Sequence, residues 1–271
     1  MIRTSLKIAV AAIALSAAAP ALAAGGAGAP DAWSDIRADI YGDRSIMEQS
    51  PLVELVTPYR AENDLRVPIR ANVDLPKGEE IKSLTLIIDE NPMPVSADFE
   101  MATDTDDFSV EVAMRFNGPT KVRAIVETKA GELLMHEAMV KTSGTGACAA
   151  PPTTGVEEAL ATLGEMDLTT PNTLQRAASD HDEVALDISH PQHSGMQMDQ
   201  VTLHYILARY VQTIESWADN EKMFTMTGSI SLSENPQIKF SIPEKDVSEL
   251  RIRMADTEGA VFQKSFSLGG S

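Results

Sequence analysis

Short stretches in which apolar and polar residues alternate dominate the sequence from Arg66 onward. In RVPIRANVDL the apolar residues occupy every second position, as they do in a strand that buries one face. Further stretches of this kind end at Asn, Gly and Pro residues, which interrupt strands and form turns. They are SLTLIID, FSVEVAMRF, TKVRAIVET and LLMHEAMVK, the last two flanking the hairpin turn KAGE. Five or six short strands within roughly 80 residues predict an antiparallel β-sandwich.

A second series of strand patterns begins at Glu183 and predicts a second antiparallel sandwich. EVALDIS opens the series, and QIKFSI follows the turn at Asn235–Pro236. Hairpins are expected where ADNE separates RYVQTIESW from KMFTMTGSISL, and where ELRIRMADTEGAVFQKSFSL turns at Glu258–Gly259. The chain is therefore expected to be all-β with two sandwich domains, at 51–142 and 183–271.

The stretch between the two domains lacks strand patterns. Residues 143–182 are small and polar, and short helices are expected only at VEEALATLG and NTLQRAAS. A connection of about 40 residues is far longer than the ~4–6 residues usual within a compact domain. We therefore predict a long flexible linker between the two domains.

The N-terminus has the features of a secretory signal peptide over residues 1–23. Arg3 and Lys7 precede an apolar run, and ALA at 21–23 is a small-residue cleavage site. The run is shorter than the ~20 residues that a membrane-spanning helix needs. A polar lead segment, 24–50, follows, with helical character from Trp33 to Met47. The sequence thus predicts an exported protein, periplasmic in a Gram-negative host, with no membrane span.

The chain is strongly acidic, with 40 Asp and Glu against 22 Lys and Arg and a formal net charge of −18. Such a charge repels nucleic acid and anionic lipid, and it favours a basic protein partner such as a c-type cytochrome. Solubility alone is the simpler interpretation of the charge.

Established catalytic motifs are absent from the sequence. It contains no G-x-S-x-G, no phosphate-binding glycine loop, no H-E-x-x-H and no C-x-x-C. His190 and His193 stand near Met196 and Met198, which are copper-ligating residue types, but their spacing matches no known ligand set. Loop histidines and core methionines are the preferred interpretation. We expect no metal and no cofactor.

Cys148 is the only cysteine in 271 residues, so it cannot form an intrachain disulfide. Its flanks, SGTGA and AAPPTT, offer no apolar surroundings, and the sequence therefore predicts an exposed thiol. Four small residues, Gly144, Gly146, Ala147 and Ala149, indicate a flexible arm without bulky side chains. The thiol is either a reactive group that joins another molecule or an incidental cysteine in a linker, and composition does not decide between them.

Family resemblance favours the reactive thiol. Residues Pro51 to Cys148 resemble SoxY, the substrate carrier of periplasmic thiosulfate oxidation. The resemblance lies in VPIRANVDLP, IIDENPMPVSADF and VRAIVETKAGELLMHEAMVKTSGTGAC. Residues Glu183 to Leu268 resemble its partner SoxZ, in SHPQHSGM, RYVQTIESWADNEKMF, SISLSENPQIKFSI and LRIRMADTEGAVFQKSF.

The resemblance implies two immunoglobulin-like sandwiches, fused as in the SoxYZ-like carriers associated with quinoprotein dehydrogenases. It also implies that Cys148 carries a covalently bound, thiosulfate-type sulfur intermediate between redox enzymes, without catalysis by the chain itself. The chain departs from SoxY in one respect. SoxY ends in Gly-Gly-Cys-Gly-Gly, whereas here alanines flank Cys148 and the chain continues, so the arm must enter a partner as a loop.

Two other functions remain open. In the first, the chain is a binding or assembly module for a quinoprotein (PQQ) dehydrogenase, and Cys148 is incidental. In the second, the chain is an enzyme that pairs Cys148 with a histidine base such as His136.

Overall fold

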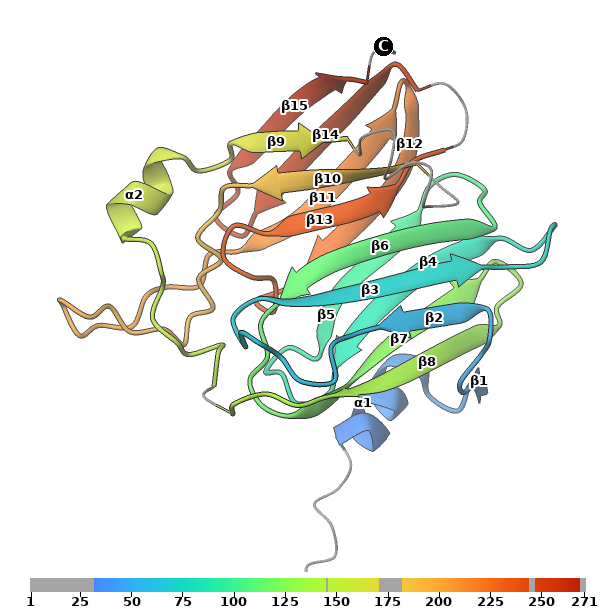
Figure 1. Cartoon of the computed structure of the whole chain (residues 1–271), viewed down its shortest axis with the longest axis horizontal. Helices are drawn as coiled ribbons and strands as arrows, with labels where there is room; N and C mark the ends of the chain where they lie inside the picture. The colour runs from blue at the N-terminus through green and yellow to red at the C-terminus, as the bar shows by residue number, and fades with distance from the viewer. Residues whose placement is uncertain (1–31, 145, 171–181, 244–246, 269–271) are drawn as a thin grey trace, which may run out of the picture. The chain divides into compact units, whose positions relative to one another are not determined.

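The computed structural model describes residues 32–144, 146–170, 182–243 and 247–268. The predicted signal peptide, the first residues of the lead segment (24–31) and the predicted helix NTLQRAAS lie outside these ranges. Within them, two antiparallel-rich sheets form the layers of a β-sandwich (Figure 1). The all-β class predicted from the alternating patterns is confirmed.

The first half of the chain contributes one helix and eight strands. Their order is α1 (Ala32–Tyr41), β1 (Ile46–Met47), β2 (Val53–Val56), β3 (Val67–Asp74), β4 (Ile81–Ile88), β5 (Val95–Met101), β6 (Asp107–Met114), β7 (Thr120–Thr128) and β8 (Leu133–Val140). The alternation in β3 has its predicted effect: Val67, Ile69, Ala71 and Val73 are all buried.

The rest of the described chain adds one short helix and seven strands. These are α2 (Val156–Ala161), β9 (Met166–Thr169), β10 (Glu183–Ile188), β11 (Val211–Ala218), β12 (Glu221–Gly228), β13 (Gln237–Ser241), β14 (Glu249–Asp256) and β15 (Val261–Ser267). The predicted hairpins β7–β8, β11–β12 and β14–β15 are confirmed as antiparallel pairs.

Both sheets run through both halves of the chain. One has the strand order β1-β8-β7-β4-β5-β12-β11-β14-β15, and the other β2-β3-β6-β13-β10-β9. Strand β5 pairs with β12, and β6 pairs with β13, so strands of one half satisfy the backbone groups at the edge of the other. The halves are thus joined by two strand pairings as well as by the connecting chain.

The predicted linker contains ordered structure. The helix expected at VEEALATLG is present as α2, but the edge strand β9 was not predicted. Its four residues are too short for their alternation to be recognised, although Met166 is buried. Strand β9 pairs with β10 and so extends the six-stranded sheet.

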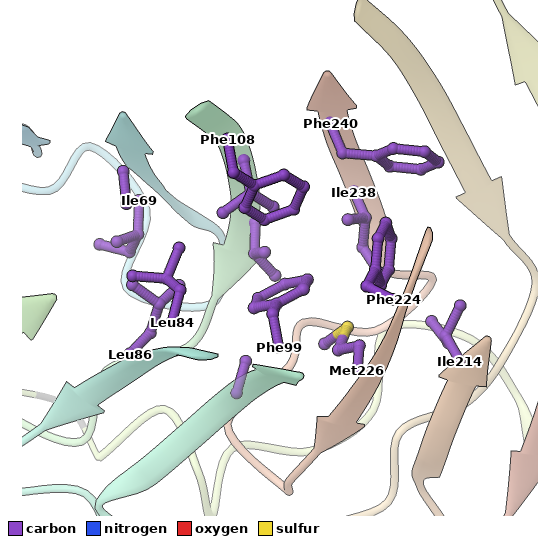
Figure 2. Packing of buried hydrophobic residues seen from close by; sticks show 14 of the residues in the cluster. Ile69, Leu84, Leu86, Phe99, Phe108, Ile214, Phe224, Met226, Ile238 and Phe240 are labelled. Atoms are coloured by element: carbon purple, nitrogen blue, oxygen red, sulfur yellow. The ribbon is translucent and has the colours of Figure 1, made fainter. Parts of the chain in front are cut away.

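The hydrophobic core is continuous between the halves (Figure 2). Four phenylalanines lie together at its centre. Phe224 on β12 has ring-centroid distances of 5.7 Å to Phe99, 5.6 Å to Phe108 and 5.2 Å to Phe240. Phe99 and Phe108 come from the first half and the other two from the second, so the halves share one core.

Helix α1 lies against a smaller apolar cluster that includes Ile125 and Met135. Its Trp33 packs on the guanidinium of Arg123, 4.1 Å from ring centroid to Cζ. Arg123 is fully buried and forms ion pairs with Asp89 and Glu137. The helix predicted from Trp33 to Met47 is present as α1, but it ends at Tyr41. None of the helices in the described part of the chain is long and apolar enough to cross a membrane.

Candidate functional site around Cys148

The cysteine segment (residues 141–155) begins directly after β8 and is held at its start by Asp64. The backbone N–H of Ser143 donates to Oδ2 of Asp64 at 2.9 Å, and the Ser143 hydroxyl also contacts this carboxylate. Asp64 is itself buried, in the loop before β3. The upstream end of the segment is therefore fixed to the first half.

A tight turn presents Cys148. The Ala149 N–H donates to the Gly146 carbonyl at 2.9 Å, and the Ala150 N–H donates to the Ala147 carbonyl at 3.3 Å. Gly144 and Gly146 have φ values of 75° and 70°, in the left-handed region that glycine adopts without strain. The two glycines thus shape the path of the segment here.

Cys148 is buried, with 0% of its surface exposed, and Ala147 is buried beside it. The predicted exposed thiol is therefore wrong for this conformation. The small side chains that suggested exposure instead allow the backbone to lie close against the second half. Of the four arm residues, Gly144 and Ala149 are exposed, Gly146 is half-buried and Ala147 is buried.

Two side chains of the second half hold the turn. The Ser194 hydroxyl donates to the Cys148 carbonyl at 2.5 Å, and Nε2 of Gln197 donates to the Ala150 carbonyl at 3.0 Å. The Ser194 N–H in turn donates to Oε1 of Gln197 at 3.1 Å, so each residue positions the other. Both hydrogen bonds to the turn join a side chain of the second half to a backbone carbonyl of the turn. They therefore do not depend on which side chains the turn carries.

Glu234 fixes the downstream end of the segment. Its carboxylate accepts hydrogen bonds from the N–H and hydroxyl of Thr153 and from the N–H of Thr154, at 2.8 to 3.0 Å. The cysteine turn therefore lies between two anchors, Asp64 upstream and Glu234 downstream.

Burial raises the pKa of the Cys148 thiol to about 11, against an opposing effect of the Arg115 guanidinium, which lowers it. At neutral pH roughly one thiol in 10⁴ is then ionised, and the thiolate is the nucleophilic form. In this conformation the thiol is protected from reaction.

Arg115 was not identified from the sequence, although its position carries a signal. It follows β6 in AMRF, between the buried residues Met114 and Phe116, and it is only 2% exposed. A cation within a run of buried residues is costly, so it indicates either a paired charge or a site.

Among the four histidines that the structure describes, none is hydrogen-bonded to Cys148. His136 lies on β8 with Nδ1 2.7 Å from the Val53 carbonyl, and the charge that acts on the Cys148 pKa is that of Arg115. His190 and His193 are buried, as expected of structural residues, and His204 lies on an exposed loop. His181 lies outside the described residues. Among the described residues, no group of three or more His, Cys, Asp or Glu side chains could hold a metal ion.

Labelling of the thiol tests how the segment is held. We expect iodoacetamide to modify Cys148 far more slowly in the native chain than in the urea-unfolded chain. Ser194→Ala removes the hydrogen bond to the Cys148 carbonyl and also the one that the hydroxyl accepts from the Met196 N–H. Loss of the bond to Cys148 should favour the open segment and raise the native rate about 2–10-fold. Ser265→Ala, an exposed serine on β15, is the matched control. Equal rates in native and unfolded wild-type protein would contradict the docked segment.

Comparison with known protein families gives one match for each half of the chain. Residues 37–148 match the family described as "Sulfur oxidation protein SoxY", a match that ends at Cys148. Residues 172–267 match "Sulphur oxidation protein SoxZ". The chain belongs to the SoxY and SoxZ families. It carries a SoxY half and a SoxZ half in one polypeptide, as the resemblance predicted, and both matches begin earlier than the resembling residues.

Similarity to solved structures is weak. The sulfur carrier protein SoxY from Chlorobium limicola f thiosulfatophilum is 22% identical, with 41% of this chain and 94% of that one covered and a TM-score of 0.33. A β-glycosidase from Bacteroides vulgatus is 8% identical, covering 80% of this chain and 24% of that one, with a TM-score of 0.22. The YadV chaperone is also 8% identical, covering 80% and 100%, with a TM-score of 0.22. No curated protein matches the chain.

Proposed function

We propose that the chain is a periplasmic carrier of sulfur oxidation, without catalytic activity of its own, which holds a sulfur intermediate covalently on Cys148. The observation that carries the proposal is the end of the SoxY match at residue 148, the only cysteine of the chain. SoxY of Chlorobium limicola f thiosulfatophilum is itself named a sulfur carrier protein.

Thiosulfate is the proposed cargo source. Joining the Cys148 sulfur to the outer sulfur of thiosulfate forms an S–S bond and gives a cysteine S-thiosulfonate. The thiol loses its proton, and two electrons leave to an oxidant. A redox partner is the proposed acceptor of these electrons. The net charge of −18 favours a basic partner such as a c-type cytochrome.

Loading requires the cysteine segment to move outward as a loop. If the anchors at Ser143 and Thr153 remain attached, nine residues, 144–152, lie between them. A chain extends ~3.4 Å per residue, so a loop out and back can carry its tip about 15 Å from the anchors. Among the described residues, the side-chain hydrogen bonds that join the turn itself to the SoxZ half are those from Ser194 and Gln197. This movement would present the thiol to a partner while the anchors stay in place.

The mass of the intact chain tests this function. Protein isolated from the periplasm of its host without reductant should carry an added mass on Cys148 that reductant removes. The Cys148→Ser chain should fold and carry none, because serine fits the space of the thiol. Wild-type protein that stays unmodified, even after exposure to thiosulfate and an oxidised c-type cytochrome, would refute the carrier function.

A binding module for a quinoprotein dehydrogenase is the second candidate, and an exposed apolar loop favours it. The loop projects from the SoxZ half between β10 and β11 (Figure 1). Val201, Leu203, Tyr205 and Leu207 are 90%, 67%, 68% and 82% exposed. Exposed apolar side chains gathered in this way are typical of protein contacts. Capture of the dehydrogenase by Cys148→Ser protein as efficiently as by wild type, together with no adduct on wild type, would favour this function.

A further inference from the structure

Arg115 is a buried cation whose side chain has unused hydrogen-bond donors. It is 2% exposed, and among the described residues its Nε and Nη1 atoms have no hydrogen-bond partner. Its backbone is fixed: the N–H donates to the Ser231 carbonyl at 2.8 Å, and its carbonyl accepts from Nδ2 of Asn91 at 2.9 Å. Buried guanidinium donors are normally paired, so this arrangement points to an anionic ligand.

A small cavity of about 190 Å³ lies beside this guanidinium. The SoxY half, the SoxZ half and the cysteine segment all line it. Its lining includes Arg66, Arg115, Gln197, Asn235 and, from the segment, Pro151 and Thr153. The volume is below the ~300 Å³ at which pockets begin to take drug-sized ligands, so the cavity suits a small group.

The other charged residues that line the cavity, Glu234 and Arg66, bond to groups other than the Arg115 guanidinium. Glu234 also lines the cavity, but its carboxylate already accepts hydrogen bonds from Thr153 and Thr154. Arg66 donates through both terminal nitrogens to the Glu234 and Asn235 carbonyls. Arg115 therefore supplies the free donors, and Glu234 acts on it only through space.

Arg115 and Cys148 lie within electrostatic range of each other. Burial raises the pKa of the thiol, and the Arg115 charge opposes that effect. His193 belongs to the same neighbourhood: its Nε2 is also without a partner, and burial, together with the charges of Arg115 and Arg209, lowers its pKa. A short group attached to the Cys148 sulfur would therefore have a cationic site nearby.

We propose that Arg115 and its cavity bind the oxyanion end of the group carried on Cys148. The site is suited to a sulfonate or thiosulfonate, because the buried guanidinium offers positively charged N–H donors, Nε and Nη1 among them, to the oxygens of such an anion. Binding there would return the loaded segment to the docked position and shield the S–S bond from solvent. This inference rests on the proposed carrier function, and its test does not depend on which enzyme loads the chain.

Chemical loading provides the test. The Cys148 thiolate attacks a central sulfur of tetrathionate, which gives the S-thiosulfonate on Cys148 and releases thiosulfate, with no other oxidant. Methyl methanethiosulfonate attaches a neutral methylthio group to Cys148 and releases methanesulfinate. The second adduct is the uncharged control. Both adducts are made on the full chain and checked by intact mass.

We expect the thiosulfonate adduct to melt about 5 °C higher than the methylthio adduct in the wild type, since a charge-assisted hydrogen bond contributes to its stability. The difference should vanish in Arg115→Met and Arg115→Gln. Both unloaded variants should melt no lower than wild type, because each removes an unpaired buried charge. A purely structural Arg115 would instead lower the melting temperature of the unloaded variants.

Two results would overturn the inference. One is an equal difference between the adducts in wild type and in both Arg115 variants. The other is an Arg115-dependent rise in melting temperature when free thiosulfate is added to Cys148→Ser protein, which would assign the site to a free ion. Absence of an adduct on protein from the native host would refute the carrier function and leave an Arg115-dependent difference between the chemical adducts intact.

Discussion

Replacing Phe224 with alanine should destabilise both halves of the chain together, by about 3–5 kcal/mol. The ring of Phe224 lies within 5.7 Å, centroid to centroid, of Phe99 and Phe108 in the SoxY half, and of Phe240 in its own half. Its removal would leave a cavity where the halves meet. Urea denaturation of the wild type should show one cooperative transition, shifted to lower urea in Phe224→Ala.

Hydrogen exchange measured by mass spectrometry can resolve the halves. In Phe224→Ala, peptides from β7 and β14 should lose protection by equal free energies, since the two strands belong to one sheet and one core. Phe266→Ala is the matched control. Phe266 is half-buried on the edge strand β15, so its loss should be smaller. Separate urea transitions of the two halves in wild-type protein would contradict a shared core.

The elements of the fold follow from local sequence patterns, but their assembly does not. Period-two alternation located β3 and most other strands, because each buries one face on the core. The pairing of β5 with β12 joins residues more than 100 positions apart, and no local pattern specifies which edges meet. Strand β9 gains its stability from β10, not from its own four residues.

The candidate site was only partly predictable for a related reason. The unique cysteine and its small neighbours identified Cys148 as the residue of interest. Its burial depends on Ser194 and Gln197, nearly 50 positions away, and polar loop residues of this kind carry no recognisable signal. Small residues are compatible with both an exposed arm and a closely docked one. The contacts of the backbone, which composition does not encode, favour the docked state.

Acidification should destabilise the chain through His190. The His190 side chain is fully buried, with Nδ1 accepting the Gln192 N–H at 3.1 Å and Nε2 3.6 Å from Oδ2 of Asp256. Burial lowers the pKa of His190 to about 4. Asp256 opposes this effect and raises the pKa, whereas Arg209 and His193 lower it further. The folded state therefore holds this histidine neutral at pH values where the unfolded chain, in which histidine has its ordinary pKa of 6.5, binds a proton.

The sign of the pH dependence follows from that depressed pKa. The contribution of His190 is fully present above about pH 6.5 and is lost progressively as the pH falls to about 4. The total loss is up to about 3 kcal/mol.

His190→Gln cannot take up the proton, so its free energy of unfolding, measured in urea, should fall less steeply between pH 7 and pH 4. His204→Gln, on an exposed loop, is the matched control for the same substitution. Because the acidic residues are common to all three chains, their titration cancels in the comparison. Parallel pH profiles for wild type and His190→Gln would show that the unfolded and folded chains bind the His190 proton equally well, against the burial seen in the structure.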